Sequence, residues 1–182
     1  MDLTGKLIIA PPSVKGNFWY KTSILVTEHH SNGSLGLVLN KRSQMTIPEF
    51  ANQVGFQLDQ AGYVYLGGPV NVKALTMLHS TDWHCSNTMR VTNDLAISSA
   101  EDLLPKLAMG DAPSQWRLFL GLCGWAPGQL EQELKGQHPF KHENSWLIAN
   151  PDTGLVFDTD LKEQWTQCVE RSGQEFAQSI LT

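Results

Sequence analysis

Hydrophobic residues in this chain gather in short runs, which polar, glycine-rich and proline-rich segments separate. Runs of this length that are rich in β-branched and aromatic residues are typical of buried strands. None approaches the roughly 18 apolar residues of a membrane span, so we expect no membrane association. The pattern predicts strands at residues 7–10, 23–27, 35–39, 63–66, 74–79, 116–122, 146–149 and 155–157.

One pair of these runs has the spacing of a β-hairpin, and a further hairpin is predicted within residues 88–97. Residues 23–27 and 35–39 flank a loop with the turn dipeptide Asn32-Gly33, and residues 88–97 surround Asn93-Asp94. Residues 23–27 and 35–39 are too close in sequence for a parallel crossover, so at least part of the sheet is antiparallel.

Capping sequences predict two of the helices. Thr46 and Glu49 have capping-box spacing and predict a short helix that ends near Gly55. Ser98 and Glu101 have the same spacing and predict a helix that reaches Gly110, with Pro105 bending or shortening it. Further helices are predicted at 129–135, closed by Gly136, and at 161–171, with Gly173 beyond the end. Short strands mixed irregularly with helices indicate an α+β fold.

Composition adds a broad class to this pattern. The chain has 182 residues, a net charge of −5, 41% hydrophobic residues and 17% charged residues. These values predict one folded domain over residues 1–182, and the acidic balance argues against a nucleic-acid partner. The apolar run at the N-terminus is too short for a signal peptide, and the three cysteines are widely spaced, which fits a cytoplasmic protein.

The strongest candidate for a binding site is the glycine-rich turn after residues 116–122. Its backbone glycines, Gly124 and Gly128, permit close approach to a ligand, and the helix that follows could favour an anion. The competing interpretation, which we favour, is a tight structural turn with Trp125 in the core. Gln129 lies at the start of that helix, and Glu131 is a candidate for a buried residue that fixes the loop.

A second glycine turn, Gly67-Gly68-Pro69, also follows a strand, and a structural turn is again the favoured interpretation. Pockets in mixed α/β proteins tend to form at strand ends. One hypothesis is therefore that Asn40, this turn, His79 and the segment 124–131 converge on one cleft that makes the chain an enzyme or a ligand sensor.

Metal and nucleophile chemistry find little support in the sequence. His79, His84 and Cys85 lack the second Cys/His pair of a zinc site, and Pro139 disfavours a chelating helix at His138 and His142. We therefore predict no metal and no cofactor. Cys123 is a candidate redox residue, although a cysteine in an apolar strand is more often an inert core residue.

An ordered set of motifs resembles the AlgH/YqgE family of bacterial proteins over nearly the whole chain. The set is Gly5-Lys-Leu-Ile-Ile-Ala-Pro-Pro, Phe18, Glu28-His29, Gly36-Leu-Val-Leu-Asn40, Gly67-Gly68-Pro69-Val70, Leu78-His79, Gly124-Trp125-Ala-Pro-Gly128-Gln129-Leu130-Glu131-Gln-Glu133, Trp146-Leu147 and Phe157-Asp158. The resemblance implies a cytoplasmic α+β protein with a curved or barrel-like, largely antiparallel sheet flanked by helices. Some members carry the label of transcriptional regulator, but the family supplies no catalytic residues to carry over.

These observations leave three functional hypotheses. The leading one is a non-catalytic protein that acts, in a regulatory role, through a small ligand or a protein partner, because no complete catalytic set is present. The second is the enzyme or ligand sensor described above. The third, direct control of transcription, finds no helix-turn-helix signature and an unfavourable charge.

Overall fold

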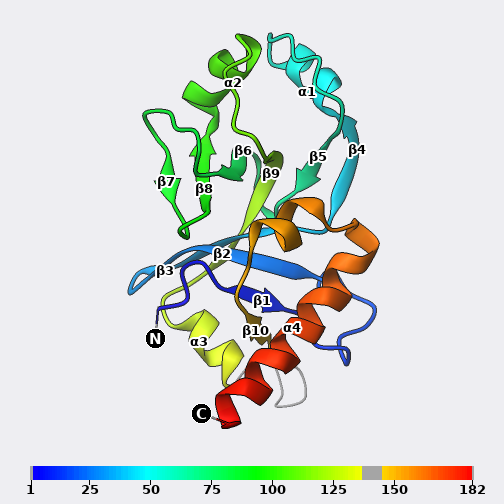
Figure 1. The fold of residues 1–182 in the computed structure, drawn as a ribbon, viewed down its shortest axis with the longest axis vertical. Helices are drawn as coiled ribbons and strands as arrows, with labels where there is room; N and C mark the ends of the chain where they lie inside the picture. Colours follow the sequence, from blue (N-terminus) through cyan, green and yellow to red (C-terminus); the bar gives the residue numbers. More distant parts are fainter. Residues whose placement is uncertain (1, 137–144, 182) are drawn as a thin grey trace. The chain divides into compact units, whose positions relative to one another are not determined.

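The computed structural model describes residues 2–136 and 145–181, which form two compact units (Figure 1). Unit 1 comprises residues 1–40 and 123–182, and unit 2 comprises residues 41–122. Strand β9 (Trp116–Trp125) supplies residues 116–122 to unit 2 and residues 123–125 to unit 1. The prediction of a single domain over residues 1–182 stays a prediction.

The sheet of unit 1 is antiparallel throughout its described strands. Its order is β10 (Leu147–Ala149), β1 (Leu7–Ile9), β2 (Ser23–His30), β3 (Gly33–Val38) and then the end of β9. The β2–β3 pair confirms the predicted hairpin, and a bulge between Val26 and Glu28 bends it. The core of this unit includes buried side chains from the sheet and its helices: Ile8, Ile24, Val26, Val38, Trp125, Leu130 and Trp146.

The sheet of unit 2 is mixed. Its order is β4 (Arg42–Thr46), β5 (Tyr63–Leu66), β9, β6 (Val70–Ser80), β8 (Leu95–Ser99) and β7 (Met89–Arg90). Strand β5 runs parallel to β9, and the other printed pairs are antiparallel. Helices α1 (Ile47–Gln53) and α2 (Ala100–Ala108) share one apolar core with this sheet. The predicted α+β class and the curled, largely antiparallel sheet are confirmed.

The two capping predictions have different outcomes. Thr46 and Glu49 form the predicted reciprocal capping box at the start of α1. The box at Ser98 is wrong, because Ser98 belongs to β8 and its hydroxyl contacts His79. Helix α2 instead follows Ser99, whose side chain makes no capping hydrogen bond. A tertiary contact of the serine therefore overrides the local signal.

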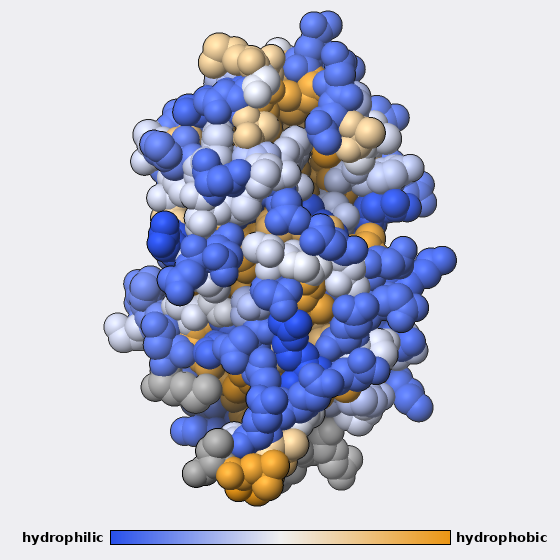
Figure 2. All heavy atoms as spheres, in the orientation of Figure 1, coloured by the Kyte–Doolittle hydropathy of each residue, from blue (hydrophilic) through white to orange (hydrophobic). Residues whose placement is uncertain are grey.

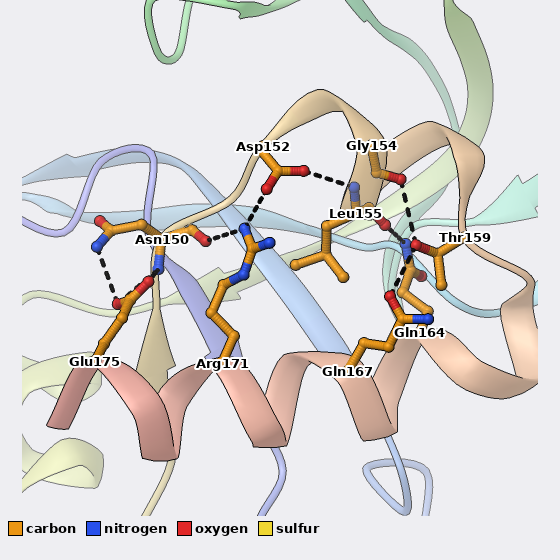
Figure 3. Close-up of polar contacts among 9 residues, drawn as sticks. All are labelled: Asn150, Asp152, Gly154, Leu155, Thr159, Gln164, Gln167, Arg171 and Glu175. Carbon is orange, nitrogen blue, oxygen red and sulfur yellow. Dashed lines mark hydrogen bonds and ion pairs between the residues drawn. The ribbon is translucent and has the colours of Figure 1, made fainter. Parts of the chain in front are cut away.

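The C-terminal part of unit 1 departs most from the prediction. Residues 155–157 are no strand but part of a π-helical turn, η2 (Gly154–Asp158), and α4 (Leu161–Leu181) continues well past Gly173. Asp152 accepts the backbone N–H of Leu155 at 2.7 Å, which starts the turn (Figure 3). Arg171 of α4 binds both Asp152 and the backbone carbonyl of Asn150 (Figure 3). Side-chain contacts to α4 thus fix residues 154–158 in a helical turn, although their apolar pattern predicted a strand.

The amide of Gln164 holds the π-helical turn from inside. Gln164 is fully buried, and its Nε2 donates to the carbonyls of Leu155 at 2.8 Å and Val156 at 3.3 Å. We expect Gln164→Leu to lower the free energy of unfolding by about 1 kcal/mol, because two buried carbonyls lose their donor while the change also removes the buried, unpartnered Oε1 of Gln164. Urea unfolding measures this. Gln174→Leu, an exposed change further along α4, is the control and should cost less than about 0.5 kcal/mol; equal losses would contradict the role of Gln164.

Polar side chains cover much of the face in Figure 2, with apolar atoms gathered at its upper and lower ends. At the C-terminal end of α4, Phe176, Ile180 and Leu181 are exposed. Within the described residues, none of the helices combines the length and the apolarity that crossing a bilayer requires.

Candidate functional site

The structure brings together six of the residues singled out in the sequence, around the end of β9 and helix α3 (Gln129–Leu134) in unit 1. They are Cys123, Gly124, Trp125, Gly128, Gln129 and Glu131. Gly67, Gly68, Pro69 and His79 belong to unit 2. The cleft predicted to combine all of these segments therefore stays a prediction.

A buried carboxylate, that of Glu133, organises the turn between β9 and α3. Its Oε2 accepts the indole N–H of Trp125 at 3.0 Å and that of Trp146 at 2.8 Å. Its Oε1 accepts Nε2–H of Gln129 at 2.9 Å, and Oε1 of Gln129 accepts the backbone N–H of Ala126 at 2.9 Å. Every one of these polar groups is satisfied inside the protein, so the network is a rigid support.

This network corrects one prediction and confirms another. Glu131, predicted as the buried residue that fixes the loop, has a side chain 38% exposed, whereas Glu133 is only 3% exposed and does that work. The sequence signal was available, because Gln129 and Glu133 are one turn apart and share a face of the helix. Trp125 lies in the core of unit 1, as the favoured structural interpretation predicted.

Beside this support lies a polar corner formed by β2, β3 and α3. His29 Nδ1 lies 2.8 Å from Ser34 Oγ, and His29 Nε2 lies 3.5 Å from Glu131 Oε1. Glu28, His30 and Ser34 line a depression of about 240 Å³ together with Trp125. Gly33 is required here, since a β-carbon at this position would meet the carbonyl oxygen of Trp125 at 2.5 Å. We call the site formed by Glu28, His29, His30, Ser34 and Glu131 the unit 1 corner.

Asn40, the other candidate in unit 1, has a structural contact pattern. Its Oδ1 accepts the backbone N–H of Ser23 at 3.1 Å, and its Nδ2 donates to the carbonyl of Lys21 at 2.7 Å. The Asn40 side chain therefore holds the backbone just before and at the start of β2. Lys21 has a positive φ of 50°, a conformation that such a hydrogen bond stabilises.

The second glycine turn docks on β9 within unit 2. The backbone N–H of Gly67 donates to the carbonyl of Leu120 at 2.8 Å. A β-carbon at position 121 would lie only 2.4 Å from the carbonyl oxygen of Gly68, so the turn packs closely against β9 at this glycine. Pro69 is exposed and leads directly into β6. These contacts support the favoured interpretation of a structural turn.

His79 anchors a buried chain of polar groups in unit 2. Its Nδ1 faces the carbonyl of Ser80 at 2.8 Å, and its Nε2 faces Ser98 Oγ at 2.9 Å. Ser98 Oγ in turn lies 2.8 Å from Thr88 Oγ1. Burial lowers the pKa of His79, although the Ser80 carbonyl and Asp82 oppose that shift.

This lowered pKa makes stability depend on pH. An unfolded histidine titrates near pH 6.5, and below that pH the unfolded chain binds a proton that folded His79 resists. We expect stability to fall as the pH drops below about 6.5, by at most about 1.4 kcal/mol per pH unit. Urea unfolding at a series of pH values measures it. His79→Gln should flatten the profile, the control His84→Gln at an exposed histidine should not, and equal profiles would contradict this assignment.

The residues considered for metal and redox chemistry give no cluster. Among residues 2–136 and 145–181, His, Cys, Asp and Glu side chains form no group of three that could hold a metal ion. His138 and His142 lie outside the described residues. Cys85, Cys123 and Cys168 are buried, and none of these three forms a disulfide. A redox role for Cys123 stays a prediction.

The chain is similar to known bacterial proteins over nearly its whole length. A family model described as AlgH-like matches residues 7–177. The chain is 32% identical to a UPF0301 protein of Pseudoalteromonas translucida, covering 97% of this chain and 95% of that one. It is also 32% identical to a UPF0301 protein of Azoarcus sp., covering 97% and 92%.

Two solved structures share the fold. The solution structure of the AlgH protein from Pseudomonas aeruginosa has a TM-score of 0.76 and 28% identity, over 94% of this chain and 89% of that one. A crystal structure of a Corynebacterium diphtheriae protein has a TM-score of 0.68 and 25% identity, over 91% and 84%. The matches extend across both units.

Proposed function

The chain belongs to the AlgH-like family, and from the geometry of its unit 1 corner we propose that it acts by binding rather than by turnover. In this proposal the corner binds a small ligand, and binding serves a regulatory role. The observation that carries it is that the polar groups of the buried Glu133 network bind one another, whereas those of the neighbouring corner are accessible to solvent. The Glu133 network uses its polar groups internally, and the carboxylates and imidazoles of the corner lie outside it.

The corner favours a partner that donates hydrogen bonds. Glu131 is 38% exposed and Glu28 is 27% exposed, and both carboxylates can accept. Of the four ionisable side chains in the corner, those of Glu28, His29, His30 and Glu131, that of His30 is the most exposed. Because Gly33 and Trp125 hold the backbone rigidly, little conformational entropy is lost on binding.

A cytoplasmic location is part of the same proposal. Its support is the absence of disulfides among the three cysteines, all of which lie in the described ranges.

The test is an NMR screen of the isotope-labelled chain against small molecules that carry amine, guanidine or amide donors, with mass analysis of each molecule afterwards. We expect hits that shift the amide signals of Gly33, Ser34 and Gly124 and that are recovered unchanged. Glu131→Gln should weaken binding about tenfold, because a charged hydrogen bond is lost. Glu163→Gln, at an exposed position on α4, is the control and should bind as the unmodified protein does.

Two results would overturn the proposal. One is a hit that is converted into a product at a rate abolished by Glu131→Gln or Ser34→Ala, which would make the corner a catalytic site. The other is a screen in which no compound moves the amides of the corner.

A further inference from the structure

A second cavity lies in unit 2, beside β7 and β8, and it is independent of the proposed function. Its volume is about 360 Å³, and its walls include Trp83, His84, Cys85, Thr88 and Arg90. Binding pockets for small molecules occupy roughly 300–1,000 Å³. The β7–β8 cavity is therefore large enough for a small metabolite.

The ionisable side chains in the cavity wall favour an anion. Arg90 and His84 are both exposed, and the wall contains no carboxylate. The nearby carboxylate of Asp111 binds other groups. Asp111 accepts the indole N–H of Trp83 at 2.8 Å and pairs with Lys106 at 3.1 Å. An arginine fork together with an imidazole is a common arrangement for carboxylate and phosphate groups.

The buried chain behind the wall fixes the direction of its hydrogen bonds. The Ser80 carbonyl can only accept, so His79 carries its proton on Nδ1. The neutral ring then accepts at Nε2 from the Ser98 hydroxyl, and Ser98 must accept from the Thr88 hydroxyl. Thr88 Oγ1 also accepts the backbone N–H of Cys85 at 2.8 Å. The proton of Thr88 Oγ1 goes to Ser98 at 2.8 Å rather than to the more distant Cys85 Sγ at 3.5 Å, so Thr88 can offer a ligand only an acceptor.

These two features define one class of ligand. We propose that the β7–β8 cavity binds a small metabolite that carries both an oxyanion and a hydroxyl group. Arg90 and His84 bind the oxyanion, and Thr88 accepts the hydroxyl proton. Hydroxy acids and sugar phosphates have this chemistry, whereas a bare anion or a neutral polyol satisfies only half of the site.

The test uses four probes in two pairs, each with the same three-carbon skeleton and the same anion: glycerate against propionate, and glycerol phosphate against propyl phosphate. Each is titrated into the isotope-labelled full chain, and the amides of Thr88, Arg90 and Ala96 are followed. We expect the hydroxylated member of at least one pair to bind about fivefold more tightly than its partner, the value of one hydrogen bond. The pair that binds identifies a carboxylate or a phosphate as the oxyanion.

Two variants separate the arginine from general surface charge. Arg90→Gln should weaken binding at least about tenfold. Arg42→Gln is the control, because Arg42 is also exposed on unit 2 but stacks on Tyr63 instead. Equal losses in the two variants, equal binding within both pairs, or no binding of any probe below about 10 mM would overturn the proposal.

Discussion

Replacing Glu133 by leucine is expected to lower the free energy of unfolding by about 3 kcal/mol or more. The change leaves the indole N–H groups of Trp125 and Trp146 and one amide proton of Gln129 without an acceptor. Each unsatisfied buried donor costs about 1–3 kcal/mol, and donors to a charged group lie at the upper end. Urea unfolding followed by tryptophan fluorescence measures the loss.

Two further variants show whether the carboxylate itself matters. Glu133→Gln keeps the shape but offers one acceptor atom where the carboxylate offers two, so it should lose about 1–2 kcal/mol. Glu131→Gln, two residues away on the exposed side, should lose less than about 0.5 kcal/mol. If Glu133→Leu were as mild as Glu131→Gln, the buried network would not be what holds the turn.

Local sequence signals predicted those parts of the fold that depend on neighbouring residues. The capping box at Thr46 and the turn at Asn32-Gly33 act within a few residues, and both appear as expected. The failures occur where a distant contact competes. Ser98 caps nothing because His79 holds its hydroxyl, and residues 155–157 wind into a π-helical turn because Gln164 binds their carbonyls.

Helix α4 shows a failure of a different kind. Gly173 predicts a helix end, yet the helix continues to Leu181. A glycine inside a helix costs only about 1 kcal/mol, and the helix N-terminal to it is fixed to unit 1 by Arg171 and by the buried Cys168. A weak local preference thus loses to an established tertiary anchor.

In the candidate site, too, local signals were predictive and contacts with residues outside the local segment were not foreseen. The sequence located the turn from β9 to α3, since glycines and Trp125 mark it, but it selected Glu131 over Glu133. The two glutamates lie on different faces of one short helix, and the positions of Trp125 and Trp146 outside that helix decide which of the two is buried. The cavity beside β7 and β8 was not predicted, because it forms only where residues 81–88 meet the paired strands β7 and β8.

The glycine at position 121 carries the second large expected effect. Gly121→Ala should lower the free energy of unfolding by about 3 kcal/mol or more, from two causes. Its φ of 74° is strained for any residue with a β-carbon, and that carbon would lie 2.4 Å from the carbonyl oxygen of Gly68. Backbone atoms of Val70 and Val72 also lie at 3.3 Å, so no flexible side chain can give way.

Gly128→Ala separates the two causes, since Gly128 has the same φ of 74° but nothing within 4 Å of the added carbon. Its loss should be the conformational cost alone, about 1–2 kcal/mol. Gly173→Ala, in a helix with open space around it, should instead gain up to about 1 kcal/mol. Thermal and urea unfolding of the three variants give the comparison. The difference between the first two then measures how closely the Gly67-Gly68 turn is packed on β9. Equal losses for Gly121→Ala and Gly128→Ala would mean that the turn can move away, and the motif would then be a flexible loop rather than a fixed part of unit 2.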